Sequence, residues 1–385
     1  MPHPVIVLAP DKFKGSLSAP AACAALERGL RRVFPQADVR ARPMADGGDG
    51  TLDAILAGGG ERHVATVSGA EGGRRAMPYG LLHDQGGDIA VLEIASIVGI
   101  TDPQGMAVPV QQRSTVGVGE LMRACLDAGV RRFIVGLGGS STNDAGAGLL
   151  HALGVRCTDA RGEEVVPVPR TLASVARIAF DRLDARLAGC EITVLSDVDN
   201  ALTGARGATA VFGPQKGVRA DNVVTLDAAL AHFAKLAEAA CGKNVQDRRG
   251  AGAAGGLGFA LMLLGASVTP GAEVVADLIG LDAALADADW LITGEGRSDE
   301  QTLAGKAPWV AAKRARALQV PASLVAGAID PAALAMLSTV FAGCFALPDG
   351  PLSLEECIAR ADALMADRAE QLARVWQGAR NAQQR

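Results

Sequence analysis

Aromatic residues and basic runs are both scarce in this 385-residue sequence. Phe, Trp and Tyr together make up 3% of the chain, and its formal net charge is −5. Nucleic-acid-binding segments typically interleave basic residues with aromatics, and no such run is present. The composition therefore gives no reason to expect a nucleic-acid partner, although individual loops can still bind small anions.

Paired cysteines and clustered histidines are also missing. The seven cysteines are scattered without a CxxC pair, which favours free thiols in a reducing cytoplasm over a disulfide framework. The five histidines are isolated and show no HExxH spacing, so a zinc site is not expected. His151 lies in an apolar run and is interpreted as a packed helix residue.

The sequence has no long, uninterrupted hydrophobic run. The N-terminus has too few apolar residues before Pro10 for a signal peptide. Residues 251–272 carry no charge, but glycines interrupt them, so we expect a glycine loop and a short buried helix. The prediction is a cytoplasmic protein with no membrane partner. The oligomeric state is left open, and a homodimer is one state that the sequence allows.

Alternating strand and helix patterns are present at both ends of the chain. The apolar run at 4–10 predicts a buried parallel strand, and Ser18 is a suitable N-cap for a helix that follows it. A second strand is predicted at 37–44. The C-terminal part predicts strands at 289–296, 321–330 and 339–347, a helix at 304–318 and a closing amphipathic helix at 353–377.

These patterns predict an α/β fold with two domains. The length and a hydrophobic content of 49% supply enough material for two cores. Five strand candidates in the two end pieces suit one doubly wound parallel sheet, so 1–63 and 288–385 are predicted to form one discontinuous domain. Residues 64–287 are predicted to form a second α/β domain inserted in the first.

The stretch "GLGGSSTNDAGAG" at 136–148 separates a predicted strand from a predicted helix. Glycines let backbone N–H groups approach an anion, hydroxyls donate hydrogen bonds, and a helix N-terminus adds positive potential. A tight turn with an N-cap is the simpler alternative, but it needs only one or two polar residues. The stretch has more than that, so it favours phosphate binding.

The standard nucleotide and hydrolase motifs are not found. No GxxxxGK[ST] loop occurs, and no GxGxxG follows the first strand, which disfavours a dinucleotide dehydrogenase. A GxSxG nucleophile elbow is also missing, which disfavours a serine hydrolase.

Charged residues follow several of the predicted strands. Asp11, Lys12 and Lys14 come directly after the first strand, where lysines can neutralise a phosphate or a carboxylate. Asp46 and Asp49 lie in a glycine-rich loop that suits Mg²⁺, which takes one or two carboxylates with water and phosphate oxygens. Both groups are also common in ordinary solvated turns.

Two further loops repeat this pattern. Asp197 follows a β-branched strand and is a candidate general base or metal ligand, and Lys216 lies beyond a second glycine stretch. Glu295 lies near the end of the predicted strand at 289–296, and Asp299 follows it. Taken together, five acidic or hydroxylic loops that each follow a strand predict Mg²⁺-dependent phosphoryl transfer.

The chain resembles the bacterial glycerate kinases of the type that makes 2-phosphoglycerate. The resemblance covers essentially the whole chain, since its blocks run from residue 9 to 308 in the family's order. These blocks are "APDKFKGSLSA", "MADGGDGT", "GLGGSSTNDAGAG", "SDVDNALTGARGATAVFGPQKG", "GAAGGLGFAL" and "TGEGRSDEQTLAGKAP". Asp49 stands where the family commonly has Glu, and Ala201 where it commonly has Pro.

The resemblance implies transfer of a phosphoryl group from ATP to D-glycerate with Mg²⁺. It also implies a flavodoxin-like domain with an inserted α/β domain. Because the candidate loops come from both predicted domains, we expect the active site in the cleft between them, where closure would exclude water. Two alternatives stay open: a kinase of another hydroxy or sugar acid on the same scaffold, and a non-catalytic regulator that binds phosphate or sugar acids.

Roles for individual residues follow as hypotheses. Asp197 is expected to be the base and Lys14 a second catalytic residue. Substrate binding is expected from Asp11, Lys12, Ser16, Asn200 and Lys216. ATP binding is expected from Gly138, Gly139, Ser140, Ser141, Thr142, Asn143, Gly255, Gly256, Glu295 and Thr302. Metal binding is expected from Asp46, Asp49 and Asp299.

Overall fold

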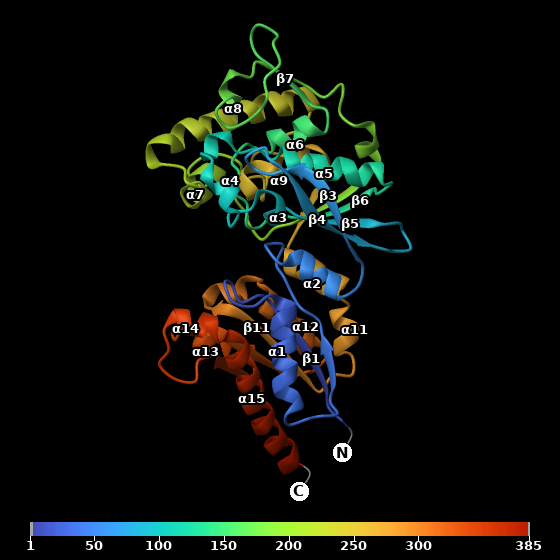
Figure 1. Cartoon of the computed structure of the whole chain (residues 1–385), viewed down its shortest axis with the longest axis vertical. Coiled ribbons are helices and arrows are strands. Elements are labelled where there is room, and N and C mark those ends of the chain that lie inside the picture. Colours follow the sequence, from blue (N-terminus) through green and yellow to red (C-terminus); the bar gives the residue numbers. More distant parts are fainter. Residues whose placement is uncertain (1–2, 384–385) are drawn as a thin grey trace. The chain divides into compact units, whose positions relative to one another are not determined.

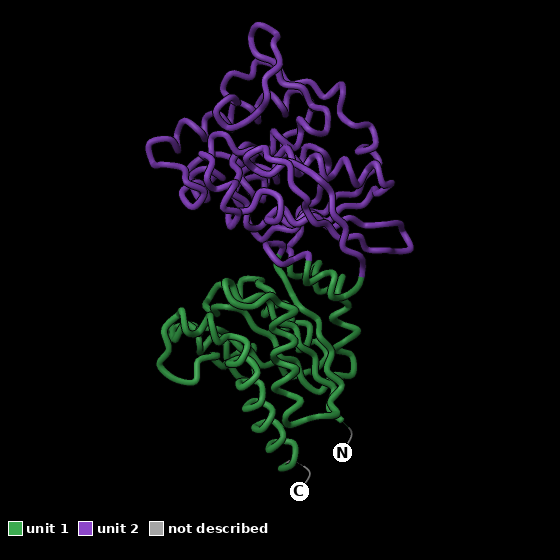
Figure 2. The backbone as a smooth tube through the Cα atoms, viewed as in Figure 1, with its two compact units in different colours: residues 1–46, 53–59, 272–385 green, residues 47–52, 60–271 purple. Residues whose placement is uncertain are grey.

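A computed structural model of the chain describes residues 3–383 and shows two compact units (Figures 1 and 2). Unit 1 consists of residues 1–46, 53–59 and 272–385, and unit 2 of residues 47–52 and 60–271. Each unit has its own sheet and helices, so the chain is an α/β protein, as predicted. The domain limits expected from the sequence stay a prediction.

Unit 1 is built on a five-stranded sheet in which every pair of neighbours is parallel. The strand order is β13-β12-β11-β1-β2. The strands are β1 (Val5–Pro10), β2 (Asp38–Ala41), β11 (Trp290–Ser298), β12 (Ala322–Ile329) and β13 (Gly343–Ala346). Four lie within stretches that the sequence predicted as strands, and β11 continues two residues beyond the predicted strand at 289–296.

Two helices, α1 (Ala19–Arg31) and α15 (Ala361–Gln383), pack together over one face of this sheet (Figure 1). Ser18 caps α1 as predicted, accepting a hydrogen bond from the Ala21 amide. The expected closing helix is divided: Arg360 separates α14 from α15, a correction to the single helix expected at 353–377. The remaining helices that lie wholly or mainly in unit 1 are α10 (Gly271–Leu278), α11 (Leu281–Leu285), α12 (Ala307–Ala317), α13 (Leu334–Leu337) and α14 (Leu354–Ala359).

Unit 2 is built on a mixed six-stranded sheet in the order β10-β9-β6-β5-β4-β3. The first four strands in this order are parallel, whereas β4 pairs antiparallel with both β5 and β3. The strands are β3 (Glu61–Ser68), β4 (Arg74–Leu82), β5 (Ile89–Glu93), β6 (Arg132–Gly136), β9 (Glu191–Leu195) and β10 (Ser267–Thr269). A separate hairpin joins β7 (Arg156–Thr158) to β8 (Arg177–Ala179).

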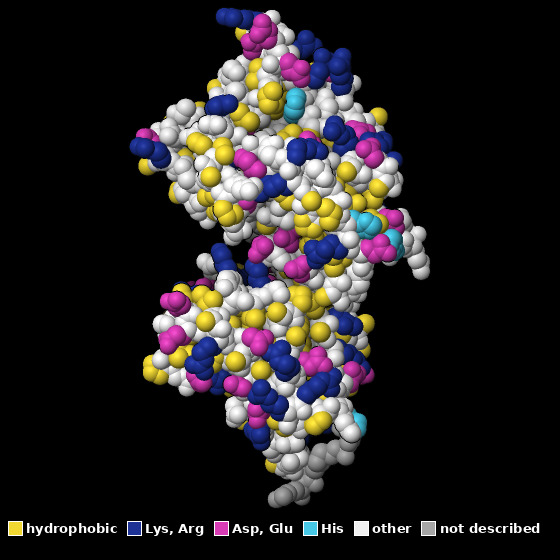
Figure 3. Space-filling model, in the orientation of Figure 1, with side chains coloured by type: hydrophobic (Ala, Val, Ile, Leu, Met, Phe, Trp, Pro, Cys, Tyr) yellow, Lys and Arg dark blue, Asp and Glu magenta, His cyan; other side chains and the backbone are white. Residues whose placement is uncertain are grey.

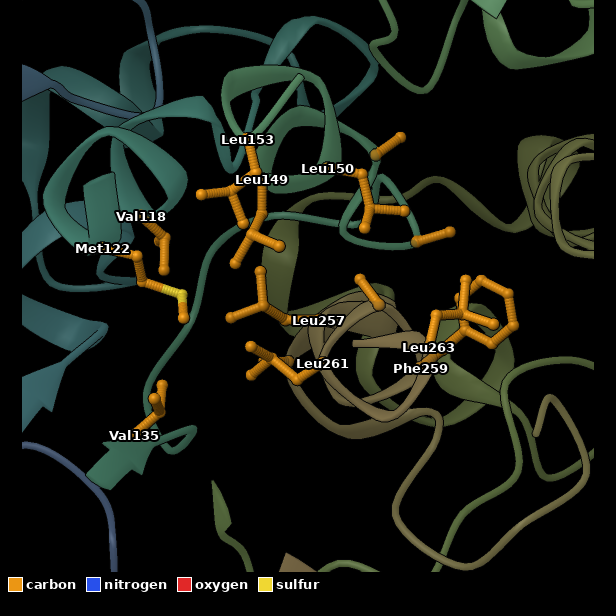
Figure 4. Packing of buried hydrophobic residues seen from close by; sticks show 14 of the residues in the cluster. Val118, Met122, Val135, Leu149, Leu150, Leu153, Leu257, Phe259, Leu261 and Leu263 are labelled. Carbon is orange, nitrogen blue, oxygen red and sulfur yellow. The ribbon is translucent and has the colours of Figure 1, made fainter. Parts of the chain in front are cut away.

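The core of unit 2 lies where its central helices meet the sheet. Figure 4 shows Leu149 of α6 and Leu153, directly after it, near Met122 of α5 and near Leu257 and Leu261 of α9. The short buried helix predicted after the glycine segment is confirmed as α9. The helices of this unit are α3 (Ala95–Val98), α4 (Pro103–Ala107), α5 (Val116–Asp127), α6 (Ala147–Ala152), α7 (Ala208–Phe212), α8 (Val223–Cys241) and α9 (Leu257–Leu263), while α2 (Thr51–Ala57) begins in unit 2 and continues in unit 1.

Charged side chains of both signs are interspersed on the face of the molecule drawn in Figure 3. Within residues 3–383 no helix is both long enough and apolar enough to cross a bilayer.

Candidate active site

In unit 1, the chain order of the strands reverses between β1 and β11. The two strands lie side by side in parallel, with Pro10 opposite Gly294, and the Asp11 amide donates to the Gly294 carbonyl over 2.8 Å. Ligands of open α/β sheets bind outside the carboxyl ends of the strands at such a reversal. The loops that follow β1 and β11 are therefore the parts of unit 1 best placed to bind a ligand.

The loop after β1 is anchored by a buried ring. Phe13 pairs with Leu17 in a short bridge and fills the space beside Gly294. This anchor leaves Lys14 and Ser16 exposed, and the Ser16 hydroxyl donates to the Phe13 carbonyl over 3.0 Å. The exposed Lys14 is thus free of the core and can reach a ligand.

Carboxylates gather at this edge of unit 1. Burial raises the pKa of Asp11 to about 8, and the negative charges of Asp46 and, more weakly, Glu295 act in the same direction. The Lys12 amide and ammonium oppose this rise. Two acids close enough to raise the pKa of a third form, together with it, a site where a cation is electrostatically favoured.

Glu295 is held at the end of β11 by two hydroxyls. Its Oε1 accepts hydrogen bonds from Ser298 Oγ (3.0 Å) and Thr302 Oγ1 (2.6 Å), and Lys306 Nζ lies 3.7 Å from its Oε2. Burial raises the pKa of Glu295, while these partners lower it. Lys306, which sequence reasoning left out of the site, also lies 3.6 Å from Asp299.

Asp299 and Thr302 have a visible structural role. They form a reciprocal cap for the short helical turn at 300–304, in which the Asp299 amide donates to Thr302 Oγ1 and the Asp299 carboxylate accepts from the Gln301 amide. Whether Asp299 also binds a metal and Thr302 also contacts ATP stays a prediction.

In unit 2, the stretch 136–148 follows β6 and leads into α6, as predicted. Gly138 is partly open and Gly139 exposed, whereas the four residues from Ser141 to Asp144 are completely buried. The open part of this loop, Gly138 and Gly139, is therefore the part that a ligand reaches first, and the buried Ser140 borders it. Direct contact between ATP and the more deeply buried residues stays a prediction.

The loop that contains Asp49 packs against this stretch. The Gly138 amide donates to the Gly47 carbonyl over 3.0 Å, and a Cβ on Gly138 would approach Gly48 Cα to 2.4 Å. Only glycine permits this approach. Asp49 is brought near Gly139 as a result, while Asp46 belongs to unit 1, so the expected pair of metal ligands is divided between the units.

The glycines of the 253–256 turn have a packing reason of their own. A Cβ on Gly255 would lie 2.0 Å from the Thr142 carbonyl oxygen, and one on Gly256 would lie 2.4 Å from Ala145 Cα. The Ala145 amide donates to the Gly255 carbonyl. This turn therefore supports the 136–148 stretch from within unit 2, and its direct contact with ATP stays a prediction.

Asp197 lies exposed at the end of β9, where its Oδ1 accepts a hydrogen bond from the Gly271 amide over 3.1 Å. The Asn200 side chain donates to the Arg206 carbonyl over 2.6 Å. Beside them is a cavity of about 720 Å³, lined by Asp199, Asn200, Ala201, Thr203, Ala205, Arg206, Asp247 and Arg249.

Lys216 is buried instead of facing solvent. Its Nζ donates to Ser140 Oγ and to the Thr142 carbonyl, so it contacts the residues that the sequence assigned to ATP.

Sequence reasoning missed Arg113 and Thr115, which lie in the stretch "RST" and show no motif of their own. Both residues hydrogen-bond to this loop.

Each unit offers a carboxylate whose donor chemistry fits Mg²⁺. No group of three His, Cys, Asp or Glu side chains among residues 3–383 is placed to hold a metal by itself. Mg²⁺ needs fewer protein ligands than three, because it binds through one or two carboxylates together with water and substrate phosphates. Asp46, whose charge acts on Asp11, is a suitable donor in unit 1, and Asp49, beside Gly139, is one in unit 2.

Comparison with known proteins gives a consistent picture. The sequence model of the glycerate kinase family matches residues 6–377. The glycerate kinase of Bacillus subtilis (strain 168) is 42% identical over 375 residues, covering 96% of each chain. The glycerate 2-kinase of Escherichia coli (strain K12) is 40% identical over 332 residues, covering 84% of this chain and 85% of the relative. A crystal structure provisionally named glycerate kinase 2 from Salmonella typhimurium LT2 has a TM-score of 0.84 at 38% identity, covering 98% of this chain and 99% of that one.

Proposed function

Because this chain belongs to the glycerate kinase family and is a glycerate kinase enzyme, we propose that it phosphorylates D-glycerate on its 2-hydroxyl, with ATP as the donor. The observation that carries the 2-position is the name of the E. coli relative, glycerate 2-kinase, at 40% identity. Two anions, glycerate and ATP, must be brought together, and positioning and charge supply most of the catalysis in such a transfer.

In the proposed reaction the glycerate 2-oxygen attacks the γ-phosphorus. The new O–P bond forms as the bond to the β–γ bridging oxygen breaks, and ADP leaves. Asp197 accepts the hydroxyl proton, for which its exposed carboxylate at the end of β9 is suitable. Lys14 and Lys12 neutralise the glycerate carboxylate or the γ-phosphate, and Asp11, Ser16 and Asn200 orient the substrate.

The loop from Gly138 to Ser140 is proposed to bind the ATP phosphates through its amides and hydroxyl, because this part of the loop is open or borders the open part. Gly255 and Gly256 support it, and Glu295 and Thr302 supply further contacts to ATP. Asp46, Asp49 and Asp299 are the proposed ligands of Mg²⁺, which when bound neutralises phosphate charge.

The fold is part of the same proposal. Numbered within unit 1, the strand order is 2-1-3-4-5, which is that of flavodoxin-like sheets. We propose that unit 1 is such a domain, that the remaining α/β unit is inserted in it near residues 64–287, and that the reaction requires residues from both.

The test is ³¹P NMR of the purified protein with Mg²⁺, ATP and D-glycerate, compared with authentic 2- and 3-phosphoglycerate. We expect the 2-phosphoglycerate signal. The 3-phosphoglycerate signal would agree with kinase activity but refute phosphorylation of the 2-hydroxyl. Intact ATP with D-glycerate but ADP formation with another hydroxy acid would refute D-glycerate as the substrate.

A further inference from the structure

Two cations are buried beneath the loop at 138–142. Lys216, at the end of the short turn Pro214–Lys216, is 2% exposed, and Arg113 is 3% exposed. Burying a charged group without a carboxylate partner is costly, so such cations are rare unless they perform a task.

Both cations bind oxygens of successive loop residues. Lys216 Nζ donates to Ser140 Oγ (2.9 Å) and to the Thr142 carbonyl (2.8 Å). Arg113 Nη1 donates to the Ser141 carbonyl (3.0 Å) and also to the Lys216 carbonyl (2.9 Å). The two side chains therefore hold residues 140, 141 and 142 together, and Arg113 holds the backbone of Lys216 in turn.

The nearest carboxylate is engaged elsewhere. Asp144 accepts hydrogen bonds from the Thr115 amide and hydroxyl, both at 2.8 Å, and from the Gly146 amide. Among residues 3–383, neither Lys216 nor Arg113 has a carboxylate as a hydrogen-bond partner. Two cations and one carboxylate thus lie under the loop, which leaves an excess of positive charge there when Lys216 is protonated.

The two cations fix the direction in which the peptide units of the loop point. None of the described peptide bonds is cis, so each carbonyl points opposite to the amide of the next residue. Because the carbonyls of Ser141 and Thr142 point at the cations, the amides of Thr142 and Asn143 point away from them. In the same two residues, Thr142 Oγ1 and Asn143 Oδ1 are buried without a hydrogen-bond partner among the described residues.

We propose that Lys216 and Arg113 are positioning residues of the kinase, which fix the 138–142 loop from its carbonyl side and place positive charge beneath the phosphates of ATP. Lys216 then acts on the reaction through the loop and does not touch glycerate. The inference rests on the proposed assignment of this loop to ATP.

The titration of Lys216 agrees with such a role. The pKa of Lys216 is lowered to about 7, mainly by burial; the charge of Asp144 opposes this change and that of Arg113 adds to it. An anion bound on the loop favours the protonated lysine, so ATP binding and protonation strengthen each other.

The first experiment compares Lys216→Met with the wild type by hydrogen–deuterium exchange of the ligand-free protein and by steady-state kinetics. Methionine keeps the length and apolar stem but removes both hydrogen bonds. We expect the amides at 138–146 to exchange at least about tenfold faster and the KM for ATP to rise by about tenfold or more, since hydrogen bonds to charged groups contribute roughly 1.5–3 kcal/mol. The KM for glycerate should stay within about twofold.

Lys243→Met is the matched control. Lys243 Nζ also donates to a backbone carbonyl of unit 2, that of Leu263 at 2.7 Å, but it has no contact with the loop. It should leave loop exchange and both KM values unchanged. If Lys216→Met does not fold, Ser140→Ala removes one acceptor of Nζ while keeping the lysine, and a rise of a few-fold in the KM for ATP is expected.

The outcomes separate the alternatives. A rise in the KM for glycerate alone would overturn the inference in favour of direct substrate contact. Unchanged loop exchange would overturn it as well. Faster exchange with an unchanged KM for ATP would refute the positioning role and, with it, the assignment of this loop to ATP. The 2-position is tested separately by the ³¹P signal.

Discussion

At the scale of single residues, Asp197 is exposed to solvent and is also held in position by a hydrogen bond. The Gly271 amide holds one carboxylate oxygen, and asparagine can accept the same hydrogen bond, so Asp197→Asn should fold normally. The variant removes the negative charge and the basicity of the side chain. We expect kcat to fall by about 10²–10⁴, the usual contribution of a general base, with the KM for glycerate little changed.

Asp199→Asn provides the comparison. Asp199 lies two residues further along the same loop and pairs with the exposed Arg249, an interaction that contributes little to stability. Its kcat should stay near that of the wild type. A near wild-type kcat for Asp197→Asn would remove Asp197 as the base.

Lys216 predicts how stability depends on pH. Its pKa falls from 10.5 in the free residue to about 7 in the folded chain, so between these values the unfolded chain binds more protons. Stability therefore rises with pH in this window, and the cost of the buried charge is fully present below pH 7. Replacing Lys216 with methionine removes this dependence.

The measurement is denaturant unfolding of the wild type and Lys216→Met at pH 7 and pH 9. We expect the wild type to gain about 2 kcal/mol relative to the variant between these pH values. Parallel pH dependences in the two proteins would show that the buried lysine does not titrate in this range.

At the scale of elements, the 253–256 turn is where backbone conformation and packing act together. Gly255 has φ +68°, and a Cβ there would lie 2.0 Å from the Thr142 carbonyl oxygen. Gly242, at the end of α8, has a similar φ of +71° with nothing within 4 Å of its Cβ position. The two glycines differ only in what surrounds them.

Gly242→Ala should therefore cost about 1 kcal/mol, the strain of a left-handed alanine. Gly255→Ala should cost about 2–4 kcal/mol and raise the KM for ATP, because the clash displaces the loop that Lys216 binds. Denaturant unfolding and steady-state kinetics of both variants measure the difference. Equal effects of the two substitutions would contradict the packing argument.

The elements of unit 1 were predictable because their sequence patterns are local. The strand β1 is a β-branched run ended by proline, and Ser18 is a standard N-cap, so both positions follow from neighbouring residues. The β3–β4 pair of unit 2 was missed, because its partly exposed strands contain charged residues and lack a clear apolar alternation. The break at Arg360 was missed because the amphipathic pattern continues across it.

The candidate site was predictable only as a set of loops. Glycines and acids after strands mark where ligands bind, but burial depends on contacts between distant segments. Nothing local to Lys216 shows that its ammonium contacts Ser140 and Thr142, more than seventy residues earlier. Arg113 carries no motif at all, and its role follows from the carbonyls that surround it.

At the scale of the whole molecule, the two hydrophobic cores share no residue. The large core cluster of unit 2 runs from Val67 to Leu263 along the chain, whereas the cluster that packs with α1 and α15 in unit 1 is made of residues up to Ala37 and from Trp290 onward. Other buried residues of unit 1, such as Ile55 and Ile279, lie between these two segments. A continuous segment therefore contains the large cluster of unit 2, whereas the core of unit 1 is assembled from separate parts of the chain. Each unit is therefore stabilised by its own core, whereas the proposed reaction requires residues of both units.

We therefore expect the fragment of residues 47–271 to fold by itself and to lack kinase activity. It keeps its own core, the six-stranded sheet and the contacts of Gly47 with the end of β6, so thermal unfolding followed by circular dichroism should be cooperative. It lacks Lys14, Asp46 and Glu295, so ³¹P NMR with ATP, Mg²⁺ and D-glycerate should show no phosphoglycerate, while the full chain under the same conditions does. An unfolded fragment would mean that unit 2 depends on unit 1 for its stability, and an active one would show that the residues of unit 1 are not needed for phosphoryl transfer.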